Sequence, residues 1–334
     1  MSTTSRTRRP SAARRRAGDR RRTALGAAAA LLVVAVGAGA WATTRAGDAT
    51  SAQALLHDDT RLGTVELNVT DLDAQRAFYG DVLGLDVLEE TDGTVALGAD
   101  DEVLVRLVRT SDALPAPDDA GLYHSALLYP DEASLAAVLR RVAAQAPASY
   151  QGASDHTVSQ AFYFADPEGN GVELYVDRPR SGWTWEDGRV RMGSTALDPG
   201  AFVAQHATDQ PRRAPTVGHV HLQVGDLDDA RRFYVDTLGF AVTSEVDGAL
   251  FMAAGGYHHH LATNTWRTRG AGPRRTASGL GSFRVLLPTA AKVDAVAERL
   301  ALAGHDVQRD GTGLTVDDPW GNTVSVAAAP SRAA

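Results

Sequence analysis

Residues 218–242 read GHVHLQVGDLDDARRFYVDTLGFAV, and residues 63–87 read GTVELNVTDLDAQRAFYGDVLGLDV. The two segments share 14 of 25 positions at a constant offset of 155 residues. Each begins with apolar residues that alternate at the period of a β-strand, and each continues with an Asp in the place of a helix N-cap (Asp71 and Asp226). A glycine then stands where a helix would stop. The repeat predicts a strand, a short helix and a further strand, twice over.

A weaker repeat follows each copy. GLYHSALLYP at 121–130 corresponds to GLGSFRVLLP at 279–288, and DPEGNGVE at 166–173 corresponds to DPWGNTVS at 318–325. A helical pattern lies between the two motifs in both cases. We therefore expect an α+β protein built from four strand–helix–strand modules, which we number one (61–110), two (121–176), three (216–266) and four (279–328).

The composition allows two cored domains and excludes several kinds of chemistry. The chain has 334 residues, of which 44% are hydrophobic and 22% charged. It has no cysteine, so disulfides, zinc–thiolate sites and thiol nucleophiles are excluded. Residues 1–23 carry nine arginines and one aspartate, so the remainder bears a charge of −16 out of the total of −8. An acidic body argues against nucleic acid as a partner.

The N-terminal region reads as a leader. The basic arm 1–23 precedes residues 24–42, ALGAAAALLVVAVGAGAWA, an uncharged stretch with the pattern of a signal or membrane segment. The arginines predict that the folded body is exported, or anchored to the cytoplasmic membrane facing outward. The alternative is a mis-assigned start codon in front of a cytoplasmic protein. Residues 43–60 then form a polar tether.

Two tandem domains follow the tether. We place the first at 61–176 and the second at 216–328. The segment between them, 177–215, is rich in Pro, Gly, Trp and Arg without a clear period, and it is interpreted as a crossover linker on the surface.

Metal-ligand residues are distributed unevenly over the modules. At the equivalent first-strand position, modules two and three have histidine (His124 and His219), and module two has Glu173 on its last strand. Histidine and carboxylate side chains that converge from strands are typical ligands of a divalent ion. Modules one and four have hydroxyl residues at these positions: Thr64, Ser282 and Ser325. If module two faces module three, one site has all three ligands and the other has none; if the modules pair in sequence order, no site is complete.

These repeats resemble the vicinal oxygen chelate superfamily, which includes glyoxalase I, bleomycin-binding proteins and type I extradiol dioxygenases. The resemblance covers about residues 61–328 and implies four βαβββ modules paired into cups around a metal. More closely, the chain resembles two-domain bacterial catechol 2,3-dioxygenases. The segments that carry this resemblance are GLYH at 121–124, GASDH at 152–156, DPEGNGVE at 166–173 and GGYHHHLATNTW at 255–266.

The resemblance implies a metal site and its catalytic neighbours. Extradiol dioxygenases hold Fe(II) with two histidines and a glutamate, and His124, His219 and Glu173 match those positions; Mn(II) is the alternative ion. For the acid–base catalyst, His258 matches a histidine of the family, and His260 is the second choice because strand alternation would place both on one face. The remaining matches, a histidine and a tyrosine beside the metal ligands, are His156 and Tyr163. His221 lies two residues beyond His219 and is expected in the same cavity, beside the ligands or merely lining it.

The function expected from these residues is an Fe(II)-dependent extradiol dioxygenase that cleaves a small aromatic diol with dioxygen. One alternative is a glyoxalase-like metal-dependent isomerase or lyase, or a thiol transferase, although glyoxalase-like sites usually carry a further carboxylate. Another is a metal-free protein that binds or sequesters a small molecule. The oligomeric state stays open, with a homo-oligomer among the options.

Overall fold

The computed structural model describes residues 53–209 and 212–330, together with Met1. Residues 53–209 and 212–330 belong to one compact unit of the chain. The expected basic arm 1–23, the apolar segment 24–42 and most of the tether lie outside the described residues, so the predictions of export or anchoring stay predictions. No helix within the described part is long and apolar enough to cross a membrane.

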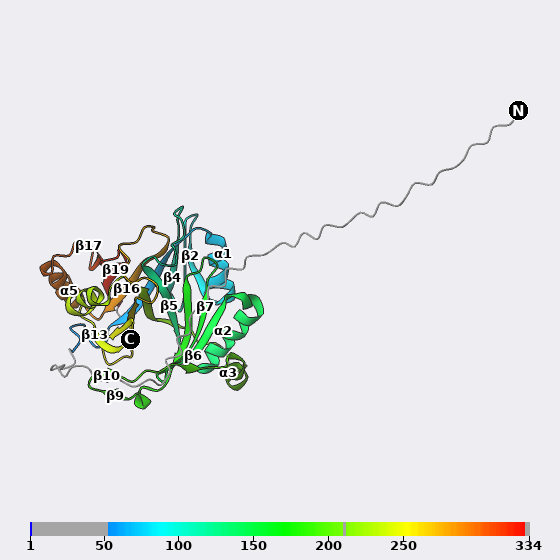
Figure 1. The fold of residues 1–334 in the computed structure, drawn as a ribbon, viewed down its shortest axis with the longest axis horizontal. Coiled ribbons are helices and arrows are strands. Elements are labelled where there is room, and N and C mark those ends of the chain that lie inside the picture. Colours follow the sequence, from blue (N-terminus) through cyan, green and yellow to red (C-terminus); the bar gives the residue numbers. More distant parts are fainter. Residues whose placement is uncertain (2–52, 210–211, 331–334) are drawn as a thin grey trace. The chain divides into compact units, whose positions relative to one another are not determined.

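The chain folds into two large mixed sheets. The 8-stranded sheet has the order β17-β18-β19-β16-β1-β4-β3-β2 (Figure 1). Its strands come only from modules one and four: β1 (Arg61–Val69), β2 (Asp86–Glu90), β3 (Thr94–Ala99), β4 (Glu102–Arg109), β16 (Gly279–Leu287), β17 (Gln308–Asp310), β18 (Gly313–Asp317) and β19 (Thr323–Ala328).

The 9-stranded sheet has the order β11-β6-β7-β8-β5-β12-β15-β14-β13. Apart from the short β11 of the linker, its strands come from modules two and three. They are β5 (Gly121–Tyr129), β6 (Tyr150–Asp155), β7 (Ser159–Ala165), β8 (Gly171–Asp177), β11 (Thr195–Ala196), β12 (Thr216–Gln223), β13 (Ala241–Val246), β14 (Ala249–Ala253) and β15 (Leu261–Asn264).

The order of the strands answers the question of how the modules pair. Strand β5 of module two pairs antiparallel with β12 of module three, and β1 of module one pairs antiparallel with β16 of module four. Module two therefore faces module three, as the distribution of ligands favoured. The four βαβββ modules and the α+β fold are confirmed.

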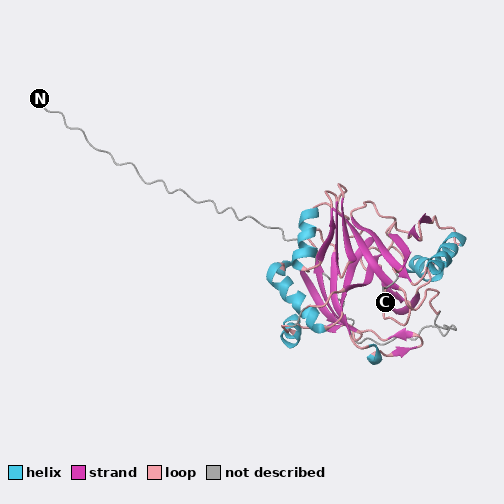
Figure 2. Ribbon diagram, turned by 180° about the vertical axis from the view of Figure 1, so that it is seen from behind, coloured by secondary structure: helices cyan, strands magenta, loops and turns pink. Residues whose placement is uncertain are grey.

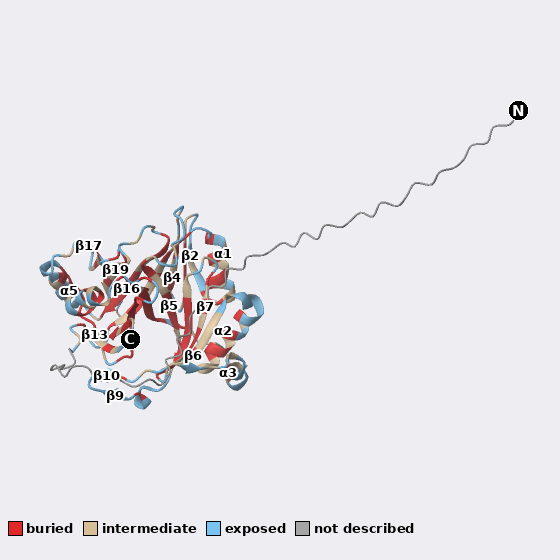
Figure 3. Cartoon of the chain, in the orientation of Figure 1, coloured by how far each residue is buried: buried red, intermediate tan, exposed pale blue. Residues whose placement is uncertain are grey.

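Helices cover the outer faces of the sheets (Figure 2). Each module has one: α1 (Leu72–Ala77) with its π-helical extension η1 (Phe78–Val82), α2 (Glu132–Gln145), α4 (Leu227–Ala230) with its extension η4 (Arg231–Thr237), and α5 (Ala290–Leu302). The expected N-caps form, since Asp71 accepts a hydrogen bond from Ala74 N at 3.0 Å and Asp226 accepts from Asp228 N at 2.9 Å. Burial follows the strands and the inner faces of the helices (Figure 3).

The linker is more regular than its sequence indicates. Besides β11 it contains the short turn η3 (Arg180–Gly182), the hairpin β9 (Trp185–Glu186) with β10 (Arg189–Val190), and helix α3 (Pro199–His206). A further short turn, η2 (Pro147–Ser149), precedes β6. Helix α3 begins at an N-cap, Asp198, followed by proline, and packs against α2. The helix is only two turns long, which is too short to show a clear apolar period.

In each domain, a tyrosine from the helix of the first module hydrogen-bonds to an aspartate of the second module. This aspartate begins the turn that leads into the last strand of the domain. Tyr234 donates to Asp318 Oδ2 at 2.7 Å, and Tyr79 donates to Asp166 Oδ2 at 3.3 Å. All four side chains are buried. Each bond links the two modules of one domain, although those modules belong to different sheets. These pairs therefore hold the two sheets together.

We expect Tyr234→Phe to lower the free energy of unfolding by about 1.5–3 kcal/mol, because a buried carboxylate loses a short hydrogen bond. Tyr79→Phe is the matched variant, and its loss should be smaller because its bond is longer. Denaturant unfolding of both variants measures this. Equal losses of unfolding free energy, or a larger loss for Tyr79→Phe, would contradict the prediction that the shorter hydrogen bond of Tyr234 contributes more to stability.

A second expectation concerns acid stability. Burial lowers the pKa of His260 from 6.5 to about 3, so the folded chain binds this proton only in strong acid, whereas the unfolded chain binds it near pH 6.5. Stability from this residue is present above pH 6.5 and is lost as pH falls below it. His260→Asn should flatten the decline of unfolding free energy between pH 6.5 and 5 by up to about 1.4 kcal/mol per pH unit. An unchanged slope in denaturant unfolding would refute this.

Candidate metal centre

The register of three neighbouring strands brings the expected ligands together. His219 on β12 lies opposite Ala126 on β5, and Ala126 lies beside Glu173 on β8. His124 is two residues before Ala126, so it points to the same face of the sheet. Three strands from two modules thus supply one cluster.

The donor atoms of this cluster lie within hydrogen-bond range of one another. His124 Nε2 is 3.0 Å from Glu173 Oε2, His219 Nε2 is 3.2 Å from the same oxygen, and the two Nε2 atoms are 3.2 Å apart. All three side chains are buried. Among the residues that the structure describes, this is the group of three His, Asp or Glu side chains whose donor atoms could share a metal ion.

These separations fit a metal ion with cis ligands. Nitrogen and oxygen ligands bind divalent transition metals at about 2.0–2.2 Å, and two such ligands at a right angle lie about 3.0 Å apart. A tetrahedral arrangement would separate them by about 3.4 Å. Two imidazoles and one carboxylate on one side of an ion form the two-histidine, one-carboxylate arrangement that leaves other positions open.

The protonation states suit metal binding. Burial opposes ionisation of Glu173, but the charge of His219 when it is protonated and the hydrogen bonds from His124 and His219 outweigh it and hold the pKa of Glu173 well below its usual range. Burial lowers the pKa of His219, although Glu173 opposes that shift. An ionised carboxylate and a neutral imidazole are the forms that bind metals. The other nitrogen of His219, Nδ1, is buried and has no hydrogen-bond partner among the described residues.

His156 and Tyr163 lie together at the edge of the cluster. Tyr163 on β7 pairs with Glu173 on β8, and its ring is 5.7 Å from the ring of His124. His156 Nδ1 is 2.9 Å from the carbonyl oxygen of Gly193, and its Nε2 is 2.7 Å from the Tyr163 hydroxyl. Nδ1–H therefore donates to the carbonyl, which leaves Nε2 to accept from Tyr163 when the imidazole is neutral. Burial raises the pKa of Tyr163 well above its usual value, so this phenol keeps its proton.

The three consecutive histidines precede β15 in an irregular turn and not on a strand. The rings of His258 and His260 both lie against Tyr257, at centroid distances of 4.1 and 4.8 Å, whereas the ring of His259 lies against His219. His258 Nε2 is 2.8 Å from Asp177 Oδ1, and its Nδ1 is 2.7 Å from Nδ1 of His259. His260 Nδ1 instead accepts from the backbone of Ala254 at 3.3 Å.

His259, which the sequence did not single out, lies nearest the cluster. Its ring centroid is 4.2 Å from that of His219, whereas the His258 ring is 6.5 Å away. His221 is also close, with its ring 4.9 Å from the ring of His124 and its Nε2 accepting from Asn264 Nδ2 at 3.0 Å. The run of three histidines was the signal in the sequence that could have indicated His259. Which of the three side chains faces the cluster depends on the turn and not on periodicity.

The equivalent face of the 8-stranded sheet, which we call the second cup, carries Thr64, Ser282 and Ser325. Thr64 Oγ1 donates to the carbonyl of Val103 at 2.9 Å. In the cluster of His124, Glu173 and His219, Ala126 lies beside Glu173. At the corresponding place of the second cup, Arg284 lies beside Ser325. Neutral hydroxyls next to a guanidinium are poor ligands for a divalent cation.

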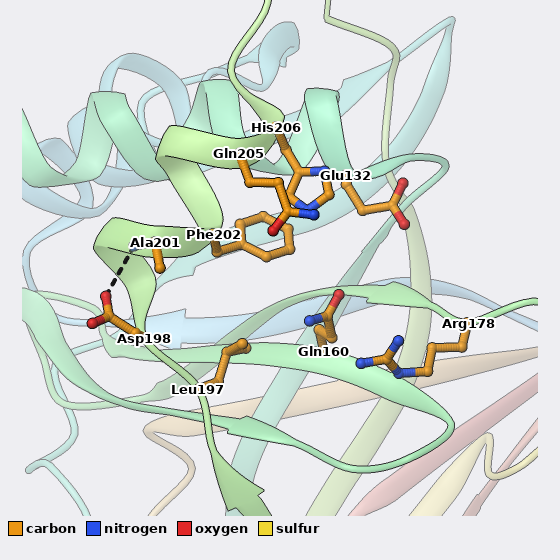
Figure 4. A pocket seen from close by; sticks show the side chains of 9 residues that line it. All are labelled: Glu132, Gln160, Arg178, Leu197, Asp198, Ala201, Phe202, Gln205 and His206. Atoms are coloured by element: carbon orange, nitrogen blue, oxygen red, sulfur yellow. Dashed lines mark hydrogen bonds between the residues drawn. The ribbon is translucent and has the colours of Figure 1, made fainter.

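Two surface cavities of about 420 Å³ lie elsewhere. One is between α3 and the 9-stranded sheet, where Phe202 and His206 of α3 face Gln160 of β7 and Arg178 (Figure 4). The other is at the edge of the second cup and includes Thr64, Arg106 and Arg284. Neither is lined by a member of the metal cluster.

Comparison with known proteins places the chain in a family. The model of the glyoxalase/bleomycin resistance protein/dioxygenase superfamily matches residues 61–174 and 216–326. The catechol-2,3-dioxygenase of Bacillus subtilis (strain 168) is 39% identical over 274 residues, which cover 79% of this chain and 95% of that protein.

Solved structures agree on the fold. A candidate dioxygenase from Bacillus subtilis subsp. subtilis strain 168 matches with a TM-score of 0.57 at 14% identity, covering 81% of this chain and 85% of that one. The cppA protein of Streptococcus pneumoniae TIGR4 matches with a TM-score of 0.50 at 9% identity, covering 83% and 100%. Both similarities concern the fold alone. With both repeats matched by the family model, the chain belongs to the glyoxalase/bleomycin resistance protein/dioxygenase superfamily.

Proposed function

We propose that this protein is an Fe(II)-dependent extradiol dioxygenase that cleaves the ring of a catechol-type substrate. The observation that carries the proposal is the convergence of His124, Glu173 and His219, with donor atoms 3.0–3.2 Å apart. The 39% identity to a protein named catechol-2,3-dioxygenase supports the same reaction. The alternative ion is Mn(II), which prefers similar ligands.

The three ligands would hold the ion from one side. Bound there, Fe(II) supplies open positions for the two oxygens of a catecholate and for dioxygen. Strands β5, β8 and β12 fix the ligands to a rigid sheet, so the open side has a constant direction. The buried setting of Glu173 and His219 excludes water from the ligand side and strengthens electrostatic interactions with a bound catechol.

The neighbouring side chains can orient the substrate and move its protons. Tyr163, held by His156, presents a phenol beside Glu173 and His124, where it can hydrogen-bond an oxygen of the substrate. We assign the acid–base role to His258 acting through His259. His258 contacts Asp177, which is partly exposed, while His259 contacts the ring of His219. This chain of groups connects the cluster with the surface. His260, the second choice from the sequence, hydrogen-bonds Ala254 instead.

Metal binding tests the ligands. His219→Ala, His124→Ala and Glu173→Gln should each weaken Fe(II) or Mn(II) binding by more than about 100-fold, since even the loss of a ligand's hydrogen-bond partner costs 10–100-fold. The matched controls are Ser282→Ala and Ser325→Ala, the equivalent positions of the second cup, which should bind metal as the unmodified chain does. Anaerobic metal titration and metal analysis give the result. A His219→Ala variant that binds normally would refute the shared site.

Turnover tests the reaction. Protein purified anaerobically and loaded with Fe(II) should convert catechol to a yellow ring-fission product, with one dioxygen consumed per catechol. An oxygen electrode and an absorbance trace record both quantities together. Turnover of methylglyoxal hemithioacetal without oxygen uptake would instead establish the glyoxalase-like isomerase. A Mn(II)-loaded sample run in parallel decides which ion supports the activity.

A further inference from the structure

The segment that precedes β1, residues 53–60, packs on module three. Strand β1 belongs to the 8-stranded sheet, whereas the backbone N–H groups of Leu55 and Leu56 donate to the carbonyl of Gly239 in module three, at 2.8 and 3.0 Å. The side chain of Leu56 is only 4% exposed and joins the hydrophobic core. We call residues 53–60 the strap.

The repeat shows that this crossing is part of the architecture. At the offset of 155 residues, Gly84 of module one is the equivalent of Gly239. The carbonyl of Gly84 accepts a hydrogen bond from the guanidinium of Arg212, which also donates to the carbonyl of Leu83 at 2.9 Å. Arg212 belongs to the segment that precedes the second domain. In each domain, the carbonyl groups just after the first helix are therefore bound by the segment that precedes the other domain.

The strap also meets the turn that carries the three histidines, residues 255–260, which we call the histidine turn. A Cβ on Gly255 would lie 2.1 Å from the carbonyl oxygen of Asp58, whereas a Cβ on Gly256 would have nothing within 4 Å among the described residues. Both glycines have a φ of +63°. Their equivalents in module one are Asp100 and Asp101, with φ of +49° and +64°, so this backbone conformation accepts an aspartate. The closeness of the strap, and not the turn alone, therefore requires glycine at position 255.

The far end of the histidine turn is fixed to the 9-stranded sheet. The carbonyl of His260 accepts a hydrogen bond from the backbone of Val220 on β12 at 3.1 Å. Between this bond and the strap, His258 and His259 contact each other at 2.7 Å, and the ring of His259 lies 4.2 Å from that of His219. The strap and the sheet thus hold the two ends of the turn, and the histidines lie between them.

We propose that the strap is a positioning element of the catalytic site, which sets the place of His258 and His259 through its contact with Gly255. The inference rests on the proposed function, because a displaced turn would impair the acid–base role assigned to His258. A misplacement of 1 Å can lower a rate by about 100-fold. The metal ligands lie on β5, β8 and β12, so metal binding does not depend on the strap.

The experiment uses four variants of the full-length protein in two matched pairs. Gly255→Ala and Gly256→Ala introduce the same side chain at the same φ, but only the first meets the strap. Leu56→Ala removes the buried anchor of the strap, whereas Leu55→Ala shortens a neighbouring side chain that is 60% exposed. For each Fe(II)-loaded variant, kcat and KM for catechol are measured together with the affinity for Fe(II).

A second measurement follows the histidine turn without any reaction. The contact between the Nδ1 atoms of His258 and His259 holds an imidazole proton, and the two side chains are only 0% and 9% exposed. Such a proton exchanges slowly with water and gives a low-field signal in the proton magnetic resonance spectrum of the metal-free protein. A change in stability alone would not move this signal.

We expect Gly255→Ala and Leu56→Ala to lower kcat by about tenfold, to leave KM and the affinity for Fe(II) unchanged, and to shift or remove the low-field signal. Gly256→Ala and Leu55→Ala should leave all four quantities unchanged. The double variant Gly255→Ala, Leu56→Ala should lose no more than the weaker of the two single variants, because both act through one contact.

Equal effects of Gly255→Ala and Gly256→Ala would overturn the proposal, because backbone strain in the turn would then be the cause. An unchanged kcat and an unchanged signal in Gly255→Ala would overturn it as well. If Leu56→Ala does not fold, the glycine pair decides.

Failure of the proposed function gives a different result. If the unmodified protein does not convert catechol, the dioxygenase assignment falls, and the low-field signal alone then tests the strap. A signal that moves in Gly255→Ala and stays in place in Gly256→Ala supports the strap as the element that positions the histidine turn. The same signal in both variants overturns the strap independently of any reaction.

Discussion

The antiparallel pairing of β5 with β12 is the interaction on which the cluster of His124, Glu173 and His219 depends. It joins module two to module three and sets Ala126 opposite His219. His124 lies two residues before Ala126 on β5, and Glu173 lies beside Ala126 on β8, so all three side chains meet. The same pairing continues one 9-stranded sheet across both domains. Because a shift of one residue would turn every side chain to the other face, the apolar positions that flank the ligands also fix their direction. The cluster is therefore a property of a strand pair, and no single domain contains it.

The sequence was sufficient for the fold and for the partners in the cluster. The offset of 155 residues identified Thr64 and His219 as equivalent, and the hydroxyls at Thr64, Ser282 and Ser325 separated a site with three candidate ligands from a site with none. The observed strand order agrees with that separation. Side chains alternate between the two faces of a strand, so a residue's number along the strand decides the face on which it lies.

Periodicity failed where the chain leaves regular structure. Two consecutive glycines, Gly255 and Gly256, both have a φ of +63° and turn the chain just before the histidine run. The turn directs His258 toward Asp177 and brings His259 against His219, and the pattern alone did not indicate which histidine meets the cluster. Helix α3 in the linker and the position of Trp266 against Tyr123 also depend on contacts between distant segments, which no local pattern encodes.

The order in which the modules pair also bears on how the chain is synthesised. Modules one and four form one sheet, and modules two and three form the other. In the sequence, the pair of modules two and three therefore lies between the two modules of the other pair. A ribosome that has released only the first domain has produced half of each sheet, each with an unpaired central edge at β1 or β5. The 9-stranded sheet cannot be completed until β15 has emerged, and the 8-stranded sheet cannot be completed until β19 has emerged. Such edges can pair with strands of other chains, so this order of pairing lengthens the time for which the growing chain is open to aggregation.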